Sequence, residues 1–322
     1  MIKIEVKKIA QLIGHIGSVF ALTQGQNAQH ILSGAGDGWI VEWDLSQPEI
    51  GKLLAKVETN IFSLLFLPIE NKIIAGNRDG GVHFIDLKDT RKNKNVSHHE
   101  KGVYSIQIID NQLFTLGGDG VLTRWSLEDN RAIESLHLSV KSLRCMDVSY
   151  ERNEIAIGAS DGNIYFLNRQ LDLVHILKKA HDNSVFTLKY TADGNHLISG
   201  GRDAHLKIWH FTDGGYLNKL LPITHHLLPI TGVSAHWFTI NSIAFHPQNP
   251  HIFATASRDK TIKIWSFQPN KAEPLILLKV LDTIRYGCHI NSVNTLYWSA
   301  YNNYLISGSD DRSLIVWQID ID

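Results

Sequence analysis

SGSDDRSLIVW, residues 307–317, decides the fold, because six related phrases precede it along the chain. Each phrase has small residues, an Asp in a turn, and a β-rich run that usually ends in Trp. The other six are SGAGDGWIVEW (33–43), AGNRDGGVHFI (75–85), TLGGDGVLTRW (115–125), IGASDGNIYFL (157–167), SGGRDAHLKIW (199–209) and TASRDKTIKIW (255–265). Their turn aspartates are spaced by 42, 40, 42, 42, 56 and 52 residues. A period near 42 residues with four short strands per unit predicts an all-β, seven-bladed β-propeller.

Three more positions recur with the turn Asp in five units. A His lies 20 to 23 residues before the Asp, a Ser or Thr lies four before it, and a Trp lies six after it. An Asp can accept from backbone N–H groups and from an imidazole, and a hydroxyl can bridge imidazole and indole. We therefore expect a buried hydrogen-bonded network in each of these blades, which we call the staple. Its members are His15, Ser33, Asp37 and Trp43; His99, Thr115, Asp119 and Trp125; His181, Ser199, Asp203 and Trp209; His236, Thr255, Asp259 and Trp265; and His289, Ser307, Asp311 and Trp317.

This joint recurrence resembles the WD-repeat β-propeller family over almost the whole chain. The literal Trp-Asp ending occurs only at Trp43-Asp44, and elsewhere the Asp is replaced. The resemblance implies a single propeller domain over residues 1–322, with four antiparallel strands per blade.

Two units depart from the staple. The second unit has Val57, Ala75 and Ile85 at the His, hydroxyl and Trp positions, and the fourth has Ser139, Ile157 and Leu167. Both units keep the turn Asp and an apolar strand pattern. We expect both to form blades that rely on hydrophobic packing alone.

The two ends of the sequence are complementary. The last unit stops just after its third strand, and residues 4–12 form an unassigned strand directly before the first unit. We therefore expect the N-terminal strand to complete the last blade, which would bury two otherwise open sheet edges.

The charge composition argues against two classes of partner, nucleic acids and anionic membranes. With 31 basic and 32 acidic residues, a net charge of −1 gives no global attraction to nucleic acid or to an anionic membrane, so we predict neither as a partner. No run of 18 apolar residues exists, and residues 1–12 lack the apolar region of a secretory signal. The two cysteines, Cys145 and Cys288, fall in different units and are expected to be free thiols. These features together predict a cytoplasmic location.

Signatures of catalysis are missing from the sequence. The 17 His residues show no zinc-ligand spacing, and there is no nucleophile elbow, phosphate loop or dinucleotide motif. The repeated Ser/Thr, His and Asp belong to the staple, where a Trp shares the hydroxyl. We predict no metal, no cofactor and no enzymatic activity. The alternative is a propeller hydrolase that uses the central channel.

In the resembled family, partners often dock on the wider top face. Carried over by register, its exposed positions lie three and five residues after the blade His and one residue before the turn Asp. They hold four aromatic and four Arg side chains, which are frequent interface hot spots and could pair with carboxylates or phosphates. The alternative is that the aromatic side chains tilt inward and only cover the hydrophobic core. The candidate partner-binding residues are Phe20, Phe62, Tyr104, Arg144, Phe186, Arg78, Arg202 and Arg258.

Two connections, 210–237 and 266–289, exceed the usual length. Two apolar segments of the first connection, 220–223 and 227–230, are expected to pack onto blades five and six or to form a second contact surface. The sequence as a whole predicts a non-catalytic scaffold that binds a protein or peptide, with an acidic or phosphorylated segment, on its top face. We expect a monomeric propeller within a complex. An obligate structural subunit of a larger assembly is a further alternative.

Overall fold

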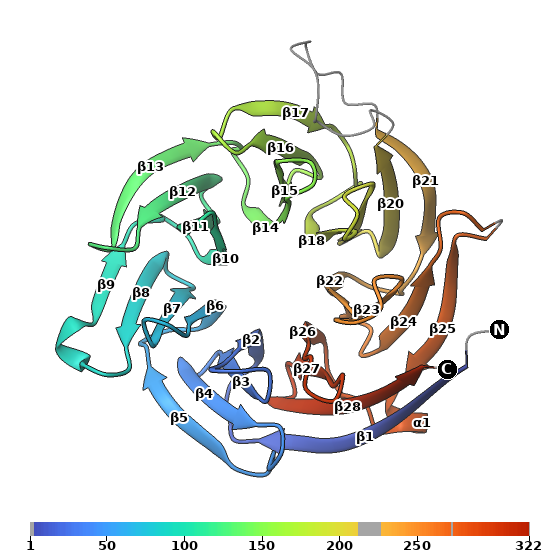
Figure 1. Cartoon of the computed structure of the whole chain (residues 1–322), viewed down its shortest axis with the longest axis horizontal. Helices are drawn as coiled ribbons and strands as arrows, with labels where there is room; N and C mark the ends of the chain where they lie inside the picture. The colour runs from blue at the N-terminus through green and yellow to red at the C-terminus, as the bar shows by residue number, and fades with distance from the viewer. Residues whose placement is uncertain (1–2, 212–226, 272, 322) are drawn as a thin grey trace.

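Seven four-stranded antiparallel sheets are arranged around a common axis in the computed structural model, which describes residues 3–211, 227–271 and 273–321 (Figure 1). This arrangement confirms the predicted seven-bladed propeller. In each blade the first strand lies innermost and the fourth lies at the outer edge.

The strands follow one another blade by blade, from the inside outward. Blade one has β2 (Val19–Gln24), β3 (His30–Ala35), β4 (Trp39–Asp44) and β5 (Gly51–Lys56). Blade two has β6 (Ile61–Leu67), β7 (Lys72–Asn77), β8 (Gly81–Asp86) and β9 (Lys94–Ser97), with a 3₁₀ turn, η1 (Thr90–Lys92), before β9. Blade three has β10 (Val103–Ile109), β11 (Gln112–Gly117), β12 (Val121–Ser126) and β13 (Arg131–His137). Blade four has β14 (Leu143–Ser149), β15 (Glu154–Ala159), β16 (Ile164–Asn168) and β17 (Leu173–Leu177).

The remaining blades are built in the same way. Blade five has β18 (Val185–Tyr190), β19 (His196–Gly201), β20 (His205–Phe211) and β21 (Leu227–Ser234). Blade six has β22 (Ile240–Phe245), β23 (Ile252–Ser257), β24 (Ile262–Phe267) and β25 (Leu275–Leu281). Blade seven has β26 (Val293–Trp298), β27 (Leu305–Ser309), β28 (Ser313–Ile321) and β1 (Ile4–Ile13), and a one-turn helix, α1 (Thr283–Tyr286), precedes it.

The long connections contribute outer strands as well as loop. Residues 227–230 belong to β21, and residues 275–281 of the second connection form β25. Residues 220–223 lie outside the described part of the chain. Segment 227–230 is therefore part of the fifth sheet by its backbone pairing with β20.

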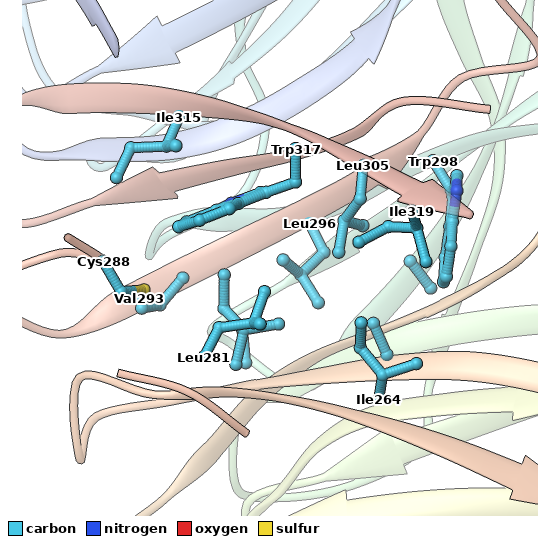
Figure 2. Close-up of a cluster of buried hydrophobic side chains, with 14 of the residues drawn as sticks. Ile264, Leu281, Cys288, Val293, Leu296, Trp298, Leu305, Ile315, Trp317 and Ile319 are labelled. Atoms are coloured by element: carbon cyan, nitrogen blue, oxygen red, sulfur yellow. The ribbon is translucent and has the colours of Figure 1, made fainter. Parts of the chain in front are cut away.

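The hydrophobic core is divided among the interfaces between blades. Seven clusters of buried side chains occur in the described residues, and each joins two neighbouring sheets. Figure 2 shows the cluster between blades six and seven, where Ile264 and Leu281 meet Trp317 and Ile319. Because sheets cover both faces of an inner strand, β19 and β23 are buried at every position, whereas β13 at an outer edge is mostly exposed.

Ring closure joins the two ends of the chain. Strand β1 pairs antiparallel with β28 from Ile4 opposite Ile321 to Ile13 opposite Ser313, and the two strands lie side by side in Figure 1. Leu12 of β1 is 1% exposed in the cluster between blades seven and one. The expected role of the N-terminal strand is therefore confirmed.

Candidate protein-interaction surface

The five staples hold their side chains in one repeated geometry. In blade one, His15 Nδ1 lies 3.0 Å from Asp37 Oδ2, and His15 Nε2 lies 2.7 Å from Ser33 Oγ. Trp43 Nε1 donates to the same hydroxyl at 2.8 Å. The corresponding distances in the other four lie between 2.7 and 3.2 Å.

A single arrangement of protons satisfies the whole chain of groups. The indole N–H donates to the hydroxyl oxygen, the hydroxyl O–H donates to a neutral imidazole, and the other imidazole N–H donates to the carboxylate. The staple hydroxyl residues are all 0% exposed, so no substrate can reach them. The Ser/Thr, His and Asp of a staple therefore work as a structural tie and not as a catalytic triad.

Burial sets the protonation of this network. It lowers the pKa of His15, His99 and His236, which favours the neutral imidazole. Burial by itself would raise the pKa of Asp203, but the hydrogen bond from His181 and hydrogen bonds from backbone N–H groups outweigh it and lower that pKa to about 2. Near pH 7 the imidazoles of His15, His99 and His236 are thus neutral and the Asp203 carboxylate is ionised.

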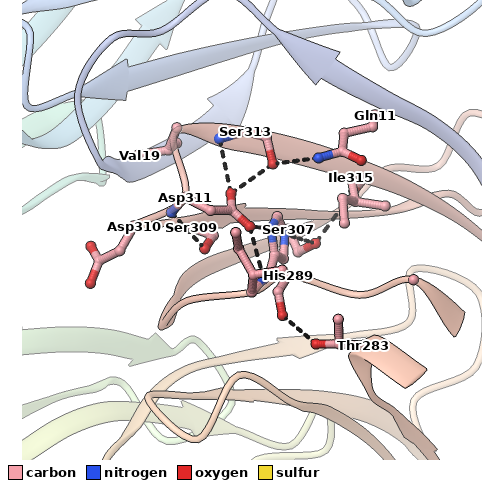
Figure 3. Close-up of polar contacts among 12 residues, drawn as sticks. Gln11, Val19, Thr283, His289, Ser307, Ser309, Asp310, Asp311, Ser313 and Ile315 are labelled. Atoms are coloured by element: carbon pink, nitrogen blue, oxygen red, sulfur yellow. Dashed lines mark hydrogen bonds and ion pairs between the residues drawn. The ribbon is translucent and has the colours of Figure 1, made fainter. Parts of the chain in front are cut away.

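The staple of blade seven also secures the ring closure. Figure 3 shows Asp311 between His289 and Ser313, and Gln11 of β1 donates to the Ser313 hydroxyl at 3.2 Å. Thr283 at the start of α1 donates to the His289 carbonyl at 2.7 Å. One network thereby connects the N-terminal strand, the last blade and the loop before it.

Blade four carries a substitute network, so the expectation that it relies on packing alone is wrong. Ser139 Oγ donates to Asp161 at 2.8 Å, and the Tyr165 hydroxyl donates to the same carboxylate oxygen at 2.6 Å. The phenol reaches the carboxylate that a His meets in the other blades. This partner could not be found from the sequence, because Tyr165 occupies none of the recurring positions.

Blade two organises its turn from a different residue. Asn77 Oδ1 accepts from the backbone N–H groups of Asp79 and Gly81 at 3.0 and 2.7 Å, and Asn77 Nδ2 lies 3.1 Å from His83 Nε2. Asp79 itself is exposed. The apolar Val57, Ala75 and Ile85 are buried, but the hydrogen bonds of Asn77 show that this blade does not rely on packing alone either.

A β-bulge is repeated at the top of every innermost strand. In all seven blades the pairing of the first strand with the second skips one residue. A bulge turns one side chain away from the regular alternation. The skipped residue is in each case the one five after the His position, and these residues are Phe20, Phe62, Tyr104, Arg144, Phe186, Asn241 and Asn294. We call this set the top-face ring.

Five members of the top-face ring form a continuous arc. The Phe20 and Phe62 rings meet edge to face with centroids 5.3 Å apart, and Phe62 stacks on Tyr104 at 5.5 Å. The Arg144 guanidinium lies 4.2 Å from the Tyr104 centroid and 5.2 Å from that of Phe186. Each of these side chains is partly buried, so the arc covers the core beneath it and also presents surface to solvent.

Two asparagines complete the top-face ring with hydrogen bonds instead of stacking. Asn241 donates to the Val293 carbonyl at 2.8 Å, and Asn294 donates to the Val19 carbonyl at 3.1 Å. Each bond reaches the innermost strand of the next blade. The ring thus has an aromatic side over blades one to five and a polar side over blades six and seven.

The four candidate arginines fall into two groups. Arg144 donates from Nε to Ser160 Oγ at 2.8 Å and is held between two aromatic rings, so it belongs to the arc. Arg78, Arg202 and Arg258 are exposed, and no ion pair or side-chain hydrogen bond holds them within the described part of the chain. Their guanidinium groups are available to an external anion.

Main-chain bonds fix these loops relative to the ring. In every blade the residue before the turn Asp donates its backbone N–H to the carbonyl three residues after the His position. In blade five, for example, Arg202 N donates to Ser184 O at 2.8 Å. The backbone of each exposed arginine is therefore held in place beside the top-face ring.

Within the described residues, neither the cysteines nor the metal-ligating residue types indicate a second functional site. Both cysteines are free, and burial raises the pKa of the Cys145 and Cys288 thiols to about 12. Over the residues described, no three His, Cys, Asp or Glu side chains gather as a metal site requires. In the same residues, no helix has the length and apolar character needed to cross a membrane.

Comparison with known families agrees with the repeated staple. The family model "WD domain, G-beta repeat" matches residues 6–44, 171–210, 228–266 and 279–318. These matches cover the last three blades and the first, including the β1–β28 junction. The chain belongs to the WD-repeat family. WD-repeat propellers are typically protein-interaction scaffolds.

Curated relatives have low sequence identity to this chain but align with most of it. The WD repeat-containing protein 26 homolog of Arabidopsis thaliana is 22% identical over 87% of this chain, and actin-interacting protein 1-2 of the same plant is 22% identical over 95%. The chain spans about half the length of these relatives, 47% of each. The WD40 β-propeller domain of Doa1 superposes with a TM-score of 0.79 at 17% identity, covering 97% of this chain and 96% of that one. This likeness supports the fold.

Proposed function

We propose that the top-face ring is the docking platform for an acidic or phosphorylated segment of a partner protein. The observation that carries this proposal is the continuous arc from Phe20 to Phe186, which a repeated bulge turns out of each sheet. Rigid aromatic groups give contact area at little entropic cost, and aromatic and Arg residues are enriched among hot spots.

The charge of the expected partner follows from the free arginines. Arg78, Arg202 and Arg258 extend from blades two, five and six around the same face. A guanidinium pairs with a carboxylate or phosphate through two parallel hydrogen bonds. A segment with apolar side chains over the arc and acidic groups beside it matches this distribution.

The proposal extends to the whole chain. Residues 1–322 act as one propeller domain, and the protein works in the cytoplasm as a monomeric, non-catalytic member of a complex. Closure through β1 and β28 supports one cooperative unit, because neither end of the ring is complete without the other.

Two single substitutions test the docking surface. Phe186→Ala removes one end of the arc, and Arg202→Glu reverses an exposed charge; neither residue belongs to a staple. We expect each to weaken capture of native partners by at least about thirtyfold, which corresponds to about 2 kcal/mol. The Arg202 contribution should fall as salt rises, because exposed charges are screened beyond about 10 Å at 0.1 M.

The control is Tyr150→Ala, a change to a side chain 64% exposed in the β14–β15 hairpin loop on the opposite face. Arg202→Glu and Tyr150→Ala should melt like the wild type, and Phe186→Ala should stay folded with a small decrease in melting temperature, because the Phe186 ring is partly buried. If folded Phe186→Ala and Arg202→Glu proteins retain every partner that the wild type binds, the top-face ring is not the docking surface.

A further inference from the structure

The residue directly after the staple His, or its equivalent, lies in the same top-face loop of every blade but differs in chemistry. It is a carboxylate in blades two, three and five, and it is apolar in the other four. The carboxylates are Glu58, Glu100 and Asp182, and the apolar residues are Ile16, Val140, Trp237 and Ile290.

In the five blades with a staple, the fold uses the backbone of this residue. The N–H groups of Ile16, Trp237 and Ile290 donate to the turn Asp of their blades at 2.8, 3.0 and 3.2 Å. Glu100 and Asp182 make the same bond at 3.0 and 3.2 Å. Since a carboxylate serves equally well at this position, folding does not require an apolar side chain there.

These apolar side chains are highly exposed, so they contribute little to the hydrophobic core. Trp237 is 86% exposed, Ile16 is 67% and Ile290 is 62%. Phe238, 57% exposed, lies beside Trp237 in the loop that leads into blade six, and Ile284 of α1, 96% exposed, lies with Ile290 in the loop that leads into blade seven. We call these five residues the rim crescent. Its two aromatics alone leave on the order of 300 Å² uncovered, the size of a patch that is often functional.

The loops that carry the rim crescent are rigid. The Phe238 carbonyl accepts from Ser257 Oγ at 3.2 Å, and the Asp282 side chain caps α1 by accepting from Arg285 N at 2.7 Å. Lys8 of β1 donates to the Gly287 carbonyl at the end of α1 at 2.8 Å. The apolar side chains are thus presented on fixed backbone, which lowers the entropic cost of binding.

The charges left free beside the rim crescent are positive. Carboxylates in these loops are already engaged: Asp259 and Asp311 in staples, Asp282 with Arg285, and Asp310 with Asn294. Within the described residues, no ion pair or side-chain hydrogen bond engages three exposed cations next to them, which are Arg258, Lys260 and Arg312.

We propose that the rim crescent binds an amphipathic helix of a partner protein, with Asp or Glu residues flanking its apolar face. Such a helix presents one continuous apolar stripe that can cover loops of neighbouring blades. An anionic membrane fits less well, because Glu58, Glu100 and Asp182 lie on the same face and would be repelled. This surface is separate from the top-face ring, whose side chains come from the innermost strands.

The chain itself supplies the test substitutions. A triple variant, Ile16→Glu, Trp237→Glu and Ile290→Glu, places at each position the type of residue that blades two, three and five already carry. It should melt like the wild type. Helical peptides of about 18 residues, five turns, with an amphipathic pattern and randomised flanks, are displayed and selected against the wild-type protein.

We expect enriched peptides with Asp or Glu flanks that shift the emission of the exposed Trp237 to the blue. The triple variant should bind them at least about thirtyfold more weakly. Two controls should bind normally: Ile69→Glu, which alters a side chain 89% exposed in the β6–β7 loop of the opposite face, and Phe186→Ala in the top-face ring. Loss of binding only in Phe186→Ala would assign the peptides to the ring.

Three outcomes overturn the proposal. One is selection of no peptide whose binding the triple variant weakens. Another is wild-type sedimentation with vesicles of phosphatidylcholine and phosphatidylserine, lost in the triple variant, which identifies the surface as a membrane contact. The third is concentration-dependent dimerisation that the triple variant abolishes, which identifies a contact between two copies of this chain.

Discussion

Replacing Thr255 by Val tests the staple with almost no change in shape. The Thr255 hydroxyl accepts from Trp265 Nε1 at 2.9 Å and lies 2.7 Å from His236 Nε2. Val leaves the indole N–H without an acceptor and the imidazole nitrogen without a donor, and both groups are buried. At about 1–3 kcal/mol for each stranded group, we expect a loss of about 2–6 kcal/mol in the free energy of unfolding. This is a large part of the roughly 5–15 kcal/mol that stabilises a typical protein.

Urea unfolding followed by circular dichroism measures the loss. Thr295→Val is the matched control, because Thr295 lies partly buried on β26 and outside the staples. Hydrogen exchange of the tryptophan indoles adds a local readout: Trp265 should lose protection in Thr255→Val, and Trp43 should keep it. Equal stability of the two variants, with Trp265 still protected, would refute the structural role assigned to the staple.

Three other perturbations have defined outcomes. Deleting residues 1–12 exposes the β28 edge and removes Leu12 from the core, so the protein should aggregate or melt much earlier; unchanged melting would mean that the ring closes in another way. Ser139→Ala should cost about 1 kcal/mol in urea unfolding, because Asp161 loses one of two side-chain donors, and no loss would contradict the substitute network. Lowering the pH from about 7 to about 5 should lower the melting temperature. Below the ordinary His pKa of 6.5 the unfolded chain binds protons, whereas buried imidazoles such as His15, whose pKa is lowered, stay neutral in the folded protein. Below about pH 4, protonation of Asp203 should lower it further, since its folded pKa is about 2 and its unfolded value is 3.8; a melting temperature constant from pH 7 to 3 would contradict both assignments.

The architecture could be predicted because the repeat is redundant. Seven turn phrases in one register give the blade count, and an unpaired strand at residues 4–12 indicates the closure. The four staple positions could also be placed, since a buried donor needs an acceptor and the spacing recurs five times. The residues that replace the staple in blades two and four, Asn77 and Tyr165, could not be predicted. Each makes its hydrogen bonds in one blade only, so no recurring sequence pattern marks it.

The candidate surface was only partly visible in the sequence. Register identified the top-face ring, but the bulge that turns its side chains out of the sheet depends on backbone pairing. The sandwich of Arg144 between Tyr104 and Phe186 depends on side-chain packing between blades, so its guanidinium could not be distinguished from the free ones of Arg78, Arg202 and Arg258. The outer strand β21 was also missed, because its Leu227-Leu228-Pro229-Ile230 start lies within an unusually long connection.

Site-specific photo-crosslinking tests the docking platform most directly. A benzophenone amino acid replaces Phe62 in the middle of the aromatic arc, or Tyr150 on the opposite face, so that an aromatic group is exchanged for another in both cases. Illumination in the native cell is followed by mass spectrometry of the crosslinked peptides. The proposed platform requires crosslinks from position 62 to a segment rich in Asp, Glu or phosphorylated residues, with no such product from position 150. Crosslinks to that partner from position 150 alone would place the docking surface on the other face and contradict the proposal.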